Sequence, residues 1–281
     1  GSVYISGTFT QSIDFDPGPA VFSLTSSGGY DWFMAKYSSS GNLIWAKKGG
    51  GSGNDAANDI DTDNSQTLFL SGYFSNTIDM NPGAPVNNLI SAGNTDMFYA
   101  RYDTSGNYIS AMRIGGSNAD AALFVKYEPL TGTIALCGIF SGTVNFNPSG
   151  SVNNMTSSAG VSGADLFFAK YSVSGSLIWV KQLGSSGAAI SALDIELDHL
   201  NPPNLFIAGF IESRSSMNSS IDLDPGIGSV NVGVNASEGK QAFVSRYVFG
   251  NVASSGNYSW SGTYDSDGDD IISGLAVDTI S

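Results

Sequence analysis

The chain of 281 residues repeats one pattern four times, and this repetition limits the fold more than any other feature. A short apolar segment with a central glycine recurs, and the glycines lie 65, 66 and 71 residues apart, at Gly7, Gly72, Gly138 and Gly209. A period of this size predicts that each repeat is one supersecondary unit. We therefore expect a single domain, 1–281, with repeat units at approximately 3–67, 68–133, 134–204 and 205–281.

Each unit carries the same succession of short segments. The glycine segment is followed by an Asp/Asn-x-Asp/Asn-Pro turn, a segment such as DWFMAKY, a Ser-Gly-Asn-like turn and a segment such as LIWAK. Aromatic and β-branched segments bounded by Gly, Pro, Asn and Ser are typical of strands and hairpins. Read with a period of two, DWFMAKY has bulky apolar residues on both faces, which favours a sheet between two neighbouring sheets.

These segments predict an all-β protein built as a β-propeller. We expect four repeated blades of about 65–71 residues, each four-stranded with an inserted hairpin, because radial repetition leaves only short, protected sheet edges. The chain begins at a second strand, VYISGTF, and ends at an inner strand, DIISGLAVD, residues 270–278. Pairing of these two strands would close the ring; the alternative is that the repeats form part of a seven- or eight-bladed ring.

The chain repeats the motifs D-x-F-x-A-K-Y, S-G-N-L-I-W, G-G-S-G-N-D-A and D-F-D-P-G. This succession of motifs resembles the SBBP family of β-propeller repeats over nearly the whole chain. This resemblance implies a bacterial secreted or surface-anchored protein, and the family name implies seven blades. The resemblance also implies an extracellular or cell-surface location.

The stretch AKYSSSGNLIWAK, residues 35–47, returns as AKYSVSGSLIWVK at residues 169–181. It is similar to the tryptophan-docking pattern of quinoprotein-type propellers, which implies that the tryptophan packs against the adjacent blade. The second repeat has Ser110 in place of this tryptophan. The matching structural positions are Gly41 with Trp45, Gly175 with Trp179, and Gly256 with Trp260.

Composition excludes several functional classes. The formal net charge of −14, with 11 basic residues against 25 acidic ones, argues against a nucleic-acid partner. No apolar run approaches the ~18 residues of a membrane-spanning helix, so we expect no membrane insertion. The chain starts GSVYISG, without an initiator Met, which suggests part of a larger polypeptide. The single cysteine, Cys137, is expected to be a small buried residue.

Paired carboxylates in the Pro-Gly turns are candidate calcium ligands, because Ca²⁺ takes six to eight oxygen ligands. The candidates are Asp14, Asp16, Asp222 and Asp224. The alternative, which we favour, is that these side chains accept hydrogen bonds from the backbone of their own turns, since Asn replaces Asp freely in the other two repeats. No other cofactor is expected.

Other charged residues have structural interpretations. His199, the only histidine, is expected in a surface loop. A recurring basic residue follows an acidic one by five positions, which favours a structural ion pair or an exposed cation. The positions are Lys36, Arg101, Lys170 and Arg246, preceded in three repeats by Asp31, Asp96 and Asp165.

Together these patterns predict a non-catalytic extracellular module that serves as a binding platform or structural spacer, with a carbohydrate or another surface protein as partner. The insertions 212–220 and 248–255 are candidate binding loops. The alternative is an enzyme acting on polysaccharide, with carboxylates in the central channel. Its candidates on inner strands are Asp61, Asp194 and Glu196.

Overall fold

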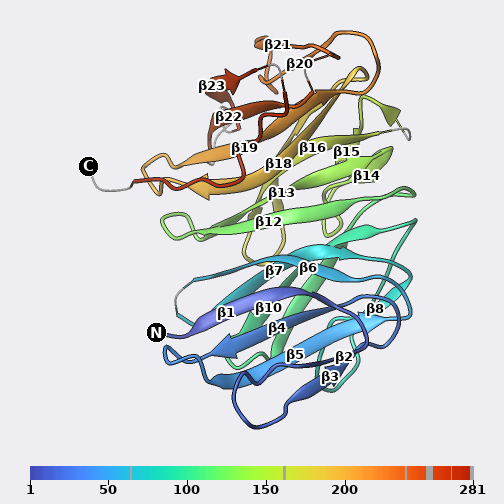
Figure 1. Ribbon diagram of the computed structural model, residues 1–281, viewed down its shortest axis with the longest axis vertical. Helices are drawn as coiled ribbons and strands as arrows, with labels where there is room; N and C mark the ends of the chain where they lie inside the picture. The colour runs from blue at the N-terminus through green and yellow to red at the C-terminus, as the bar shows by residue number, and fades with distance from the viewer. Residues whose placement is uncertain (64, 161–162, 238, 251–255, 267, 279–281) are drawn as a thin grey trace. The chain divides into compact units, whose positions relative to one another are not determined.

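The computed structural model describes residues 1–63, 65–160, 163–237, 239–250, 256–266 and 268–278 (Figure 1). Every regular element in these ranges is a β-strand, and the sheets are antiparallel, so the all-β prediction is confirmed. No helix in the described ranges is long and apolar enough to cross a membrane.

The strands group into four repeats by their sheets, and β6, β12 and β18 each belong to the repeat after the one in which the predicted bounds placed them. Repeat 1 contains β1 (Val3–Phe9), β2 (Ser12–Asp14), β3 (Ser23–Thr25), β4 (Asp31–Tyr37) and β5 (Leu43–Gly51). Repeat 2 contains β6 (Ala56–Thr62), β7 (Thr67–Phe74), β8 (Thr77–Asp79), β9 (Asn88–Ile90), β10 (Asp96–Asp103) and β11 (Tyr108–Ile114). Repeat 3 contains β12 (Ala121–Glu128), β13 (Thr133–Ser141), β14 (Thr143–Asn145), β15 (Asn154–Thr156), β16 (Ala164–Ser172) and β17 (Leu177–Leu183). Repeat 4 contains β18 (Ala188–Leu197), β19 (Asn204–Ser213), β20 (Ser219–Asp222), β21 (Asn231–Val234), β22 (Gln241–Val248) and β23 (Tyr258–Tyr264).

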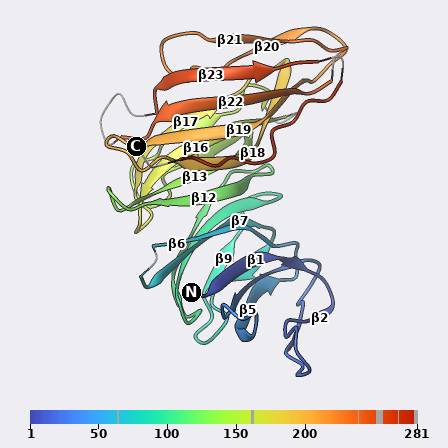
Figure 2. The same cartoon turned by 60° about the vertical axis from the view of Figure 1, so that its left-hand side comes forward.

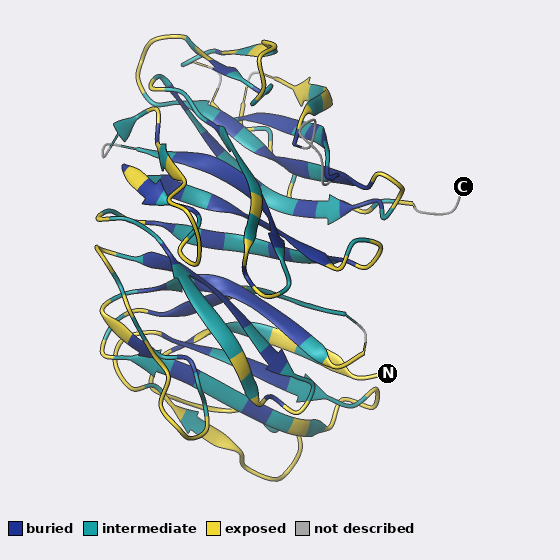
Figure 3. Cartoon of the chain, turned by 180° about the vertical axis from the view of Figure 1, so that it is seen from behind, coloured by how far each residue is buried: buried dark blue, intermediate teal, exposed yellow. Residues whose placement is uncertain are grey.

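Repeats 2, 3 and 4 each form a four-stranded sheet in the predicted order of inner, second, third and outer strand. The sheets are β6-β7-β10-β11, β12-β13-β16-β17 and β18-β19-β22-β23, the last of which is seen side by side in Figure 2. This is the strand order of a propeller blade, so we call each of these sheets a blade. The three strands β1-β4-β5 of repeat 1 are blade 1, in which no described inner strand pairs with β1. The middle strands are buried on both faces, as β7 and β10 are, whereas turns and sheet edges are exposed (Figure 3).

A two-stranded hairpin, which we call the ribbon, is inserted after the second strand of every repeat: β2-β3, β8-β9, β14-β15 and β20-β21. The tyrosine near the end of each third strand donates a hydrogen bond from its hydroxyl to a carbonyl in the ribbon turn. The pairs are Tyr37 to Phe15, Tyr102 to Met80, Tyr171 to Phe146 and Tyr247 to Leu223, at 2.6–3.0 Å. One repeated side chain therefore fixes each ribbon to its own blade.

In repeats 2 and 4 the glycine of the second strand lies opposite a bulge in the inner strand. The register shifts between Ala57 and Asp59 opposite Gly72, and a Cβ at Gly72 would collide with the carbonyl oxygen of Ala56. Gly209 meets the carbonyl of Ser191 in the same way. A bulge brings two residues against one, so only glycine leaves room for the backbone here.

The chain divides into two compact units, residues 1–125 and 126–281. The first contains blades 1 and 2, and its core includes Trp32, Met34, Phe74, Phe98 and Tyr102, all fully buried. Within this unit β8 of the second ribbon pairs with the end of β5. The second unit contains blade 4 and all of blade 3 except the first residues of β12.

The predicted inner strand at residues 270–278 is wrong, because residues 271–278 carry no strand. An inner strand is stabilised by the ladder with its own second strand, and no strand pairs with this segment in the described ranges. The backbone N–H of Leu275 nevertheless donates to Asp194 at 2.7 Å, as that of Val125 in β12 donates to Asp59 at 3.0 Å. The segment therefore makes one hydrogen bond typical of an inner strand but lacks the backbone hydrogen bonds to a neighbouring strand. Ring closure and blade number stay predictions.

Candidate functional site

The four ribbon turns share one hydrogen-bond scheme. The first Asp or Asn of each turn accepts two backbone N–H groups on the same side-chain oxygen, from the residues two and eight positions later. In repeat 1 the Oδ1 atom of Asp14 lies 3.0 Å from the nitrogen of Asp16 and 2.8 Å from that of Phe22. Asp79, Asn145 and Asp222 make the equivalent pairs of bonds. The scheme closes the turn and uses an oxygen that Asp and Asn share.

The candidate calcium ligands fall into these turns as two separate pairs, Asp14 with Asp16 and Asp222 with Asp224. Asp16 and Asp224 each accept the N–H of the glycine two residues later, at 2.8 Å. In the part of the chain that the structure describes, no group of three or more His, Cys, Asp or Glu side chains gathers at one point. Backbone bonding accounts for one oxygen of each carboxylate, and a calcium ion would have to use the others.

Two tryptophans attach one blade to the next. The indole N–H of Trp45 donates to the carbonyl of Thr104 at 3.2 Å, and that of Trp179 donates to the carbonyl of Gly250 at 3.1 Å. The lysine on the third strand of the same blade adds a second donor: Lys36 to Thr104 at 3.2 Å, and Lys170 to Phe249 at 2.7 Å. Blade 1 is thereby attached to blade 2, and blade 3 to blade 4.

The other two repeats differ at this position. Ser110, which replaces the tryptophan in repeat 2, accepts a hydrogen bond from Arg101 of its own blade at 3.0 Å. Trp260 is 41% exposed and packs edge-on against Phe206, also of its own blade. The docking arrangement therefore occurs once in each compact unit.

The turn before each outer strand requires a positive φ. Gly41, Gly106, Gly175 and Gly256 have φ of 82°, 76°, 93° and 73°. A Cβ at Gly106 would press on the side chains of Lys47 and Trp45, and one at Gly256 on those of Lys181 and Trp179. These two glycines thus combine left-handed backbone with close packing against the lysine stem and the tryptophan ring.

The predicted ion pairs five residues apart are wrong. Asp31 binds Lys48 at 2.7 Å and Asp96 binds Arg113 at 2.5 Å, both from the neighbouring outer strand. Residues five apart on a strand point to opposite faces, so Lys36 lies far from Asp31 and reaches the next blade instead. The acids themselves are fully buried.

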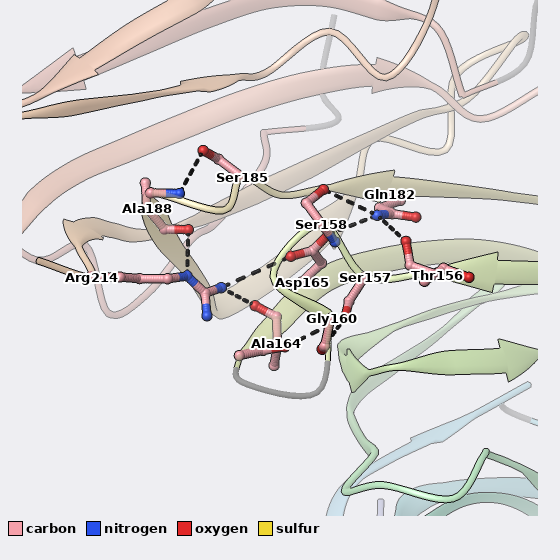
Figure 4. A network of polar contacts seen from close by, with 12 residues as sticks. Thr156, Ser157, Ser158, Gly160, Ala164, Asp165, Gln182, Ser185, Ala188 and Arg214 are labelled. Carbon is pink, nitrogen blue, oxygen red and sulfur yellow. Dashed lines mark hydrogen bonds and ion pairs between the residues drawn. The ribbon is translucent and has the colours of Figure 1, made fainter.

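Asp165 has a different set of partners (Figure 4). Its carboxylate accepts the N–H of Ser158 at 2.6 Å and the amide of Gln182 at 2.7 Å, and the guanidinium of Arg214 lies 3.9 Å away. Arg214 also donates to the carbonyls of Ala188 and Ala164. Arg214 lies in the insertion 212–220, so this part of a predicted binding loop has a structural role; residues 251–255 of the other insertion lie outside the described ranges.

Asp55 is a further buried carboxylate, in the turn before β6. Burial raises the pKa of Asp55 to about 6, and the charge of Asp31 raises it further. Hydrogen bonds from the N–H groups of Gly51 and Ser75 act in the opposite direction and lower the pKa. Its contacts are all with its own unit, so we assign it to the packing of blades 1 and 2.

The candidates for catalysis have structural partners. Asp194 accepts the N–H groups of Ile195 and Leu275, and Glu196 lies 3.5 Å from Lys126. Asp61 accepts the N–H of Thr62 at 2.8 Å. Asp61 belongs to the first compact unit and the other two acids to the second, and the structure brings only Asp194 and Glu196 onto one strand, β18.

His199 and Cys137 are placed as follows. The Nδ1 atom of His199 lies 2.9 Å from the buried carboxylate of Glu128, and its side chain is partly exposed. Cys137 is fully buried on β13, and burial raises the pKa of its thiol far above the ordinary value. Such a thiol is a packing group rather than a nucleophile.

A pocket of about 470 Å³ lies in the first unit, beside the docked tryptophan. The middle of β5 contributes Lys47, the second ribbon turn contributes Asn81, and the start of β11 contributes Tyr108. The remaining lining residues are Gly83, Ala84, Pro85, Asn87, Gly106 and Asn107.

The second unit has the equivalent pocket, of about 390 Å³. Lys181, Asp224 and Tyr258 take the places of Lys47, Asn81 and Tyr108. The other lining residues are Gly226, Ile227, Gly228 and Asn257. An adjoining pocket of about 450 Å³ shares Lys181 and Asp224.

Our reading of the sequence missed these pockets, although a signal was present. The outer strand begins with Leu, Tyr, Leu and Tyr in the four repeats, and its fifth residue is Lys, Met, Lys and Gly. The lysine of an odd repeat and the tyrosine of the following even repeat face one pocket. The signal is an alternation with a period of two repeats, whereas we aligned all four repeats as equals.

No family model matches the chain. A curated protein of Acanthamoeba polyphaga mimivirus, described as an uncharacterized WD repeat-containing protein L264, is 26% identical over 155 residues. The match covers 52% of this chain and 11% of that protein's length. This distant similarity agrees with a repeated β-propeller fold and gives no support to the SBBP family in particular.

Proposed function

We propose that this chain is a non-catalytic β-propeller module that acts as a binding platform in a secreted or surface protein. The observation that carries the proposal is the matched pair of pockets, one in each compact unit, formed where one blade meets the next. The recurring residues around them fix turns, ribbons and blade contacts, whereas the ammonium groups of the pocket-lining lysines make no hydrogen bond among the described residues. The partner we propose is a carbohydrate or another surface protein.

The distant WD repeat-containing relative is consistent with a repeat scaffold for binding. The alternative, an enzyme acting on polysaccharide, has less support, because Asp194 and Glu196 are engaged with Leu275 and Lys126. It predicts cleavage of a polysaccharide that is lost in the Asp194→Asn and Glu196→Gln variants.

The test is a glycan array probed with the purified chain, once with calcium and once with chelator. Reproducible binding to a subset of glycans, without release of reducing ends, would support the proposal. Loss of binding in chelator would add calcium as a cofactor held by the ribbon-turn carboxylates. Release of reducing ends from any polysaccharide would contradict the non-catalytic part of the proposal.

A further inference from the structure

The two matched pockets offer polar groups that the fold itself does not use. Among the described residues, the ammonium groups of Lys47 and Lys181 make no hydrogen bond; Lys47 interacts only electrostatically with Asp103. The carboxylate of Asp103 is occupied by the turn, through the N–H groups of Ser105 and Asn107 and the amide of Asn107. Each pocket therefore presents a lysine donor to whatever enters it.

Each pocket also contains side-chain amide or carboxylate groups that remain available for hydrogen bonds. In the first pocket the hydroxyl of Tyr108 donates to the side-chain oxygen of Asn87 at 3.0 Å, which leaves the amide N–H groups of Asn87 and the side-chain oxygen of Asn107 without partners in the described ranges. In the second pocket one oxygen of Asp224 is held by Gly226, and the other is accessible because Gly228 has no Cβ to collide with it. Both pockets are thus lined by hydrogen-bond donors and acceptors together with a tyrosine.

The difference between the pockets narrows the ligand class. The first pocket has Asn81, whose amide donates to the carbonyl of Pro85 at 2.5 Å, where the second has the carboxylate of Asp224. A phosphate or other anion would be repelled by Asp224 and by the net charge of −14. A ligand that fits both pockets must be uncharged and must both donate and accept hydrogen bonds.

We infer that each pocket binds one neutral hexopyranose or pentopyranose residue of a polysaccharide. Adjacent sugar hydroxyls can accept from the lysine and donate to the Asn or Asp oxygen, while the apolar face of the ring packs on Tyr108 or Tyr258. Glycines line both pockets, Gly83 and Gly106 in the first and Gly226 and Gly228 in the second, and leave room for a ring of this size. This inference rests on the proposed binding function and names its ligand class.

Isothermal titration calorimetry with cellohexaose, maltohexaose, mannohexaose and xylohexaose tests the inference on the full chain. We expect at least one probe to bind with two sites for each chain. Lys47→Gln and Lys181→Gln should each remove one site, or weaken it about tenfold to a hundredfold, because a hydrogen bond to a charged donor contributes about 1.5–3 kcal/mol. Tyr108→Phe should retain the aromatic contact and most of the affinity.

Met112→Gln is the matched control, since Met112 occupies the same strand position as Lys47 in a blade that contributes no lysine to a pocket. It should leave the number of sites and the affinity unchanged. If a probe binds equally well to the Lys47→Gln, Lys181→Gln double variant, the pockets are not the sites and the inference is overturned, while the binding function stands. If neither the array nor calorimetry detects binding of a neutral saccharide, the inference fails, and a carbohydrate partner fails with it.

Discussion

Three equivalent buried carboxylates are neutralised in two ways. Asp31 and Asp96 each have a cation from the adjacent outer strand, but the corresponding residue beside Asp165 is the neutral Gln182. The positive charge near Asp165 comes from Arg214 of the next repeat. A buried carboxylate requires compensation, so the long reach of an arginine from blade 4 replaces the local ion pair of blade 3.

Replacement of Arg214 should therefore destabilise the protein. Arg214→Ala removes the cation beside Asp165 and the guanidinium donor to the carbonyls of Ala164 and Ala188, and we expect a loss of about 3 kcal/mol in the free energy of unfolding. Arg214→Lys keeps the positive charge but not the several N–H donors of the guanidinium, so its loss of unfolding free energy should be smaller. Denaturant unfolding measures both, with Lys181→Ala as a near-neutral control; equal stability of Arg214→Ala and the wild type would contradict the structural role.

The raised pKa of Asp55 predicts a pH dependence of stability. An unfolded Asp ionises near 3.8 and the folded one near 6, so between these values the folded state binds more protons and stability falls as pH rises. A shift of about two units corresponds to ~3 kcal/mol. The unfolding free energy of Asp55→Asn relative to the wild type should rise by about this amount from about pH 3.5 to about pH 7. A difference that does not change with pH would show that Asp55 ionises normally.

These residue-scale details were only partly predictable. The composition of each third strand indicated its buried faces, but the partner of each acid depends on the register between strands. That register places Lys48 opposite Phe33, from where its ammonium group reaches Asp31. Arg214 lies 49 positions beyond Asp165 in an insertion found in one repeat only. No pattern common to all repeats could have identified it.

At the scale of elements, the ribbon turn is a hydrogen-bonded motif that tolerates either Asp or Asn. Asn145 of repeat 3 accepts the same two backbone N–H groups as Asp222, and Asn81 of repeat 2 accepts the glycine N–H as Asp224 does. We therefore expect the Asp222→Asn, Asp224→Asn double variant to fold with a stability within ~0.5 kcal/mol of the wild type. Thermal unfolding with calcium and with chelator checks it: a calcium-dependent stabilisation that the double variant lacks would make these carboxylates metal ligands.

The docking tryptophans predict a second element-scale effect. Trp179 packs edge-on against Phe249, 5.3 Å between ring centroids, and donates to the carbonyl of Gly250. Trp179→Ala should cost about 2–3 kcal/mol of unfolding free energy, since it removes a partly buried ring and a hydrogen bond. Trp260→Ala, at an exposed position where no described carbonyl accepts from the indole, should cost under ~1 kcal/mol. Similar losses for the two variants in denaturant unfolding would mean that docking to the next blade contributes nothing.

Strand type and order were predictable from hydrophobic alternation and turn residues, because each repeat encodes its own hairpins locally. The segment at residues 270–278 shows where this reasoning stops. Its residues have the pattern of the inner strand β12, but a strand also requires a neighbouring strand to accept and donate its backbone hydrogen bonds. The sequence of the segment alone does not say whether such a neighbour is present.

At the scale of the whole molecule, the chain is a duplicated pair of blades rather than four equal repeats. The odd repeats supply the docking tryptophan and the pocket lysine, and the even repeats supply the turn that receives them both. The division into units at residue 125 follows the one described outer strand that has a serine in place of tryptophan. Each pair of blades therefore has a pocket at the place where the lysine of the odd repeat meets the tyrosine of the even one.

Two sites on one chain predict avidity for a polysaccharide that reaches both. Once one pocket is occupied, binding of the second becomes intramolecular, and overall affinity can rise by roughly 10²–10⁴. Lys47→Gln should therefore speed dissociation from a surface coated with the polysaccharide of the best probe by ~100-fold, while the remaining site keeps its affinity for the short oligosaccharide. Surface plasmon resonance compares binding of the wild type and of Lys47→Gln to the polysaccharide and to the short oligosaccharide. If Lys47→Gln lowers the apparent affinity only about twofold for both ligands, the pockets act singly. Only simultaneous binding at both pockets makes the loss of affinity for the polysaccharide larger than the loss of one site.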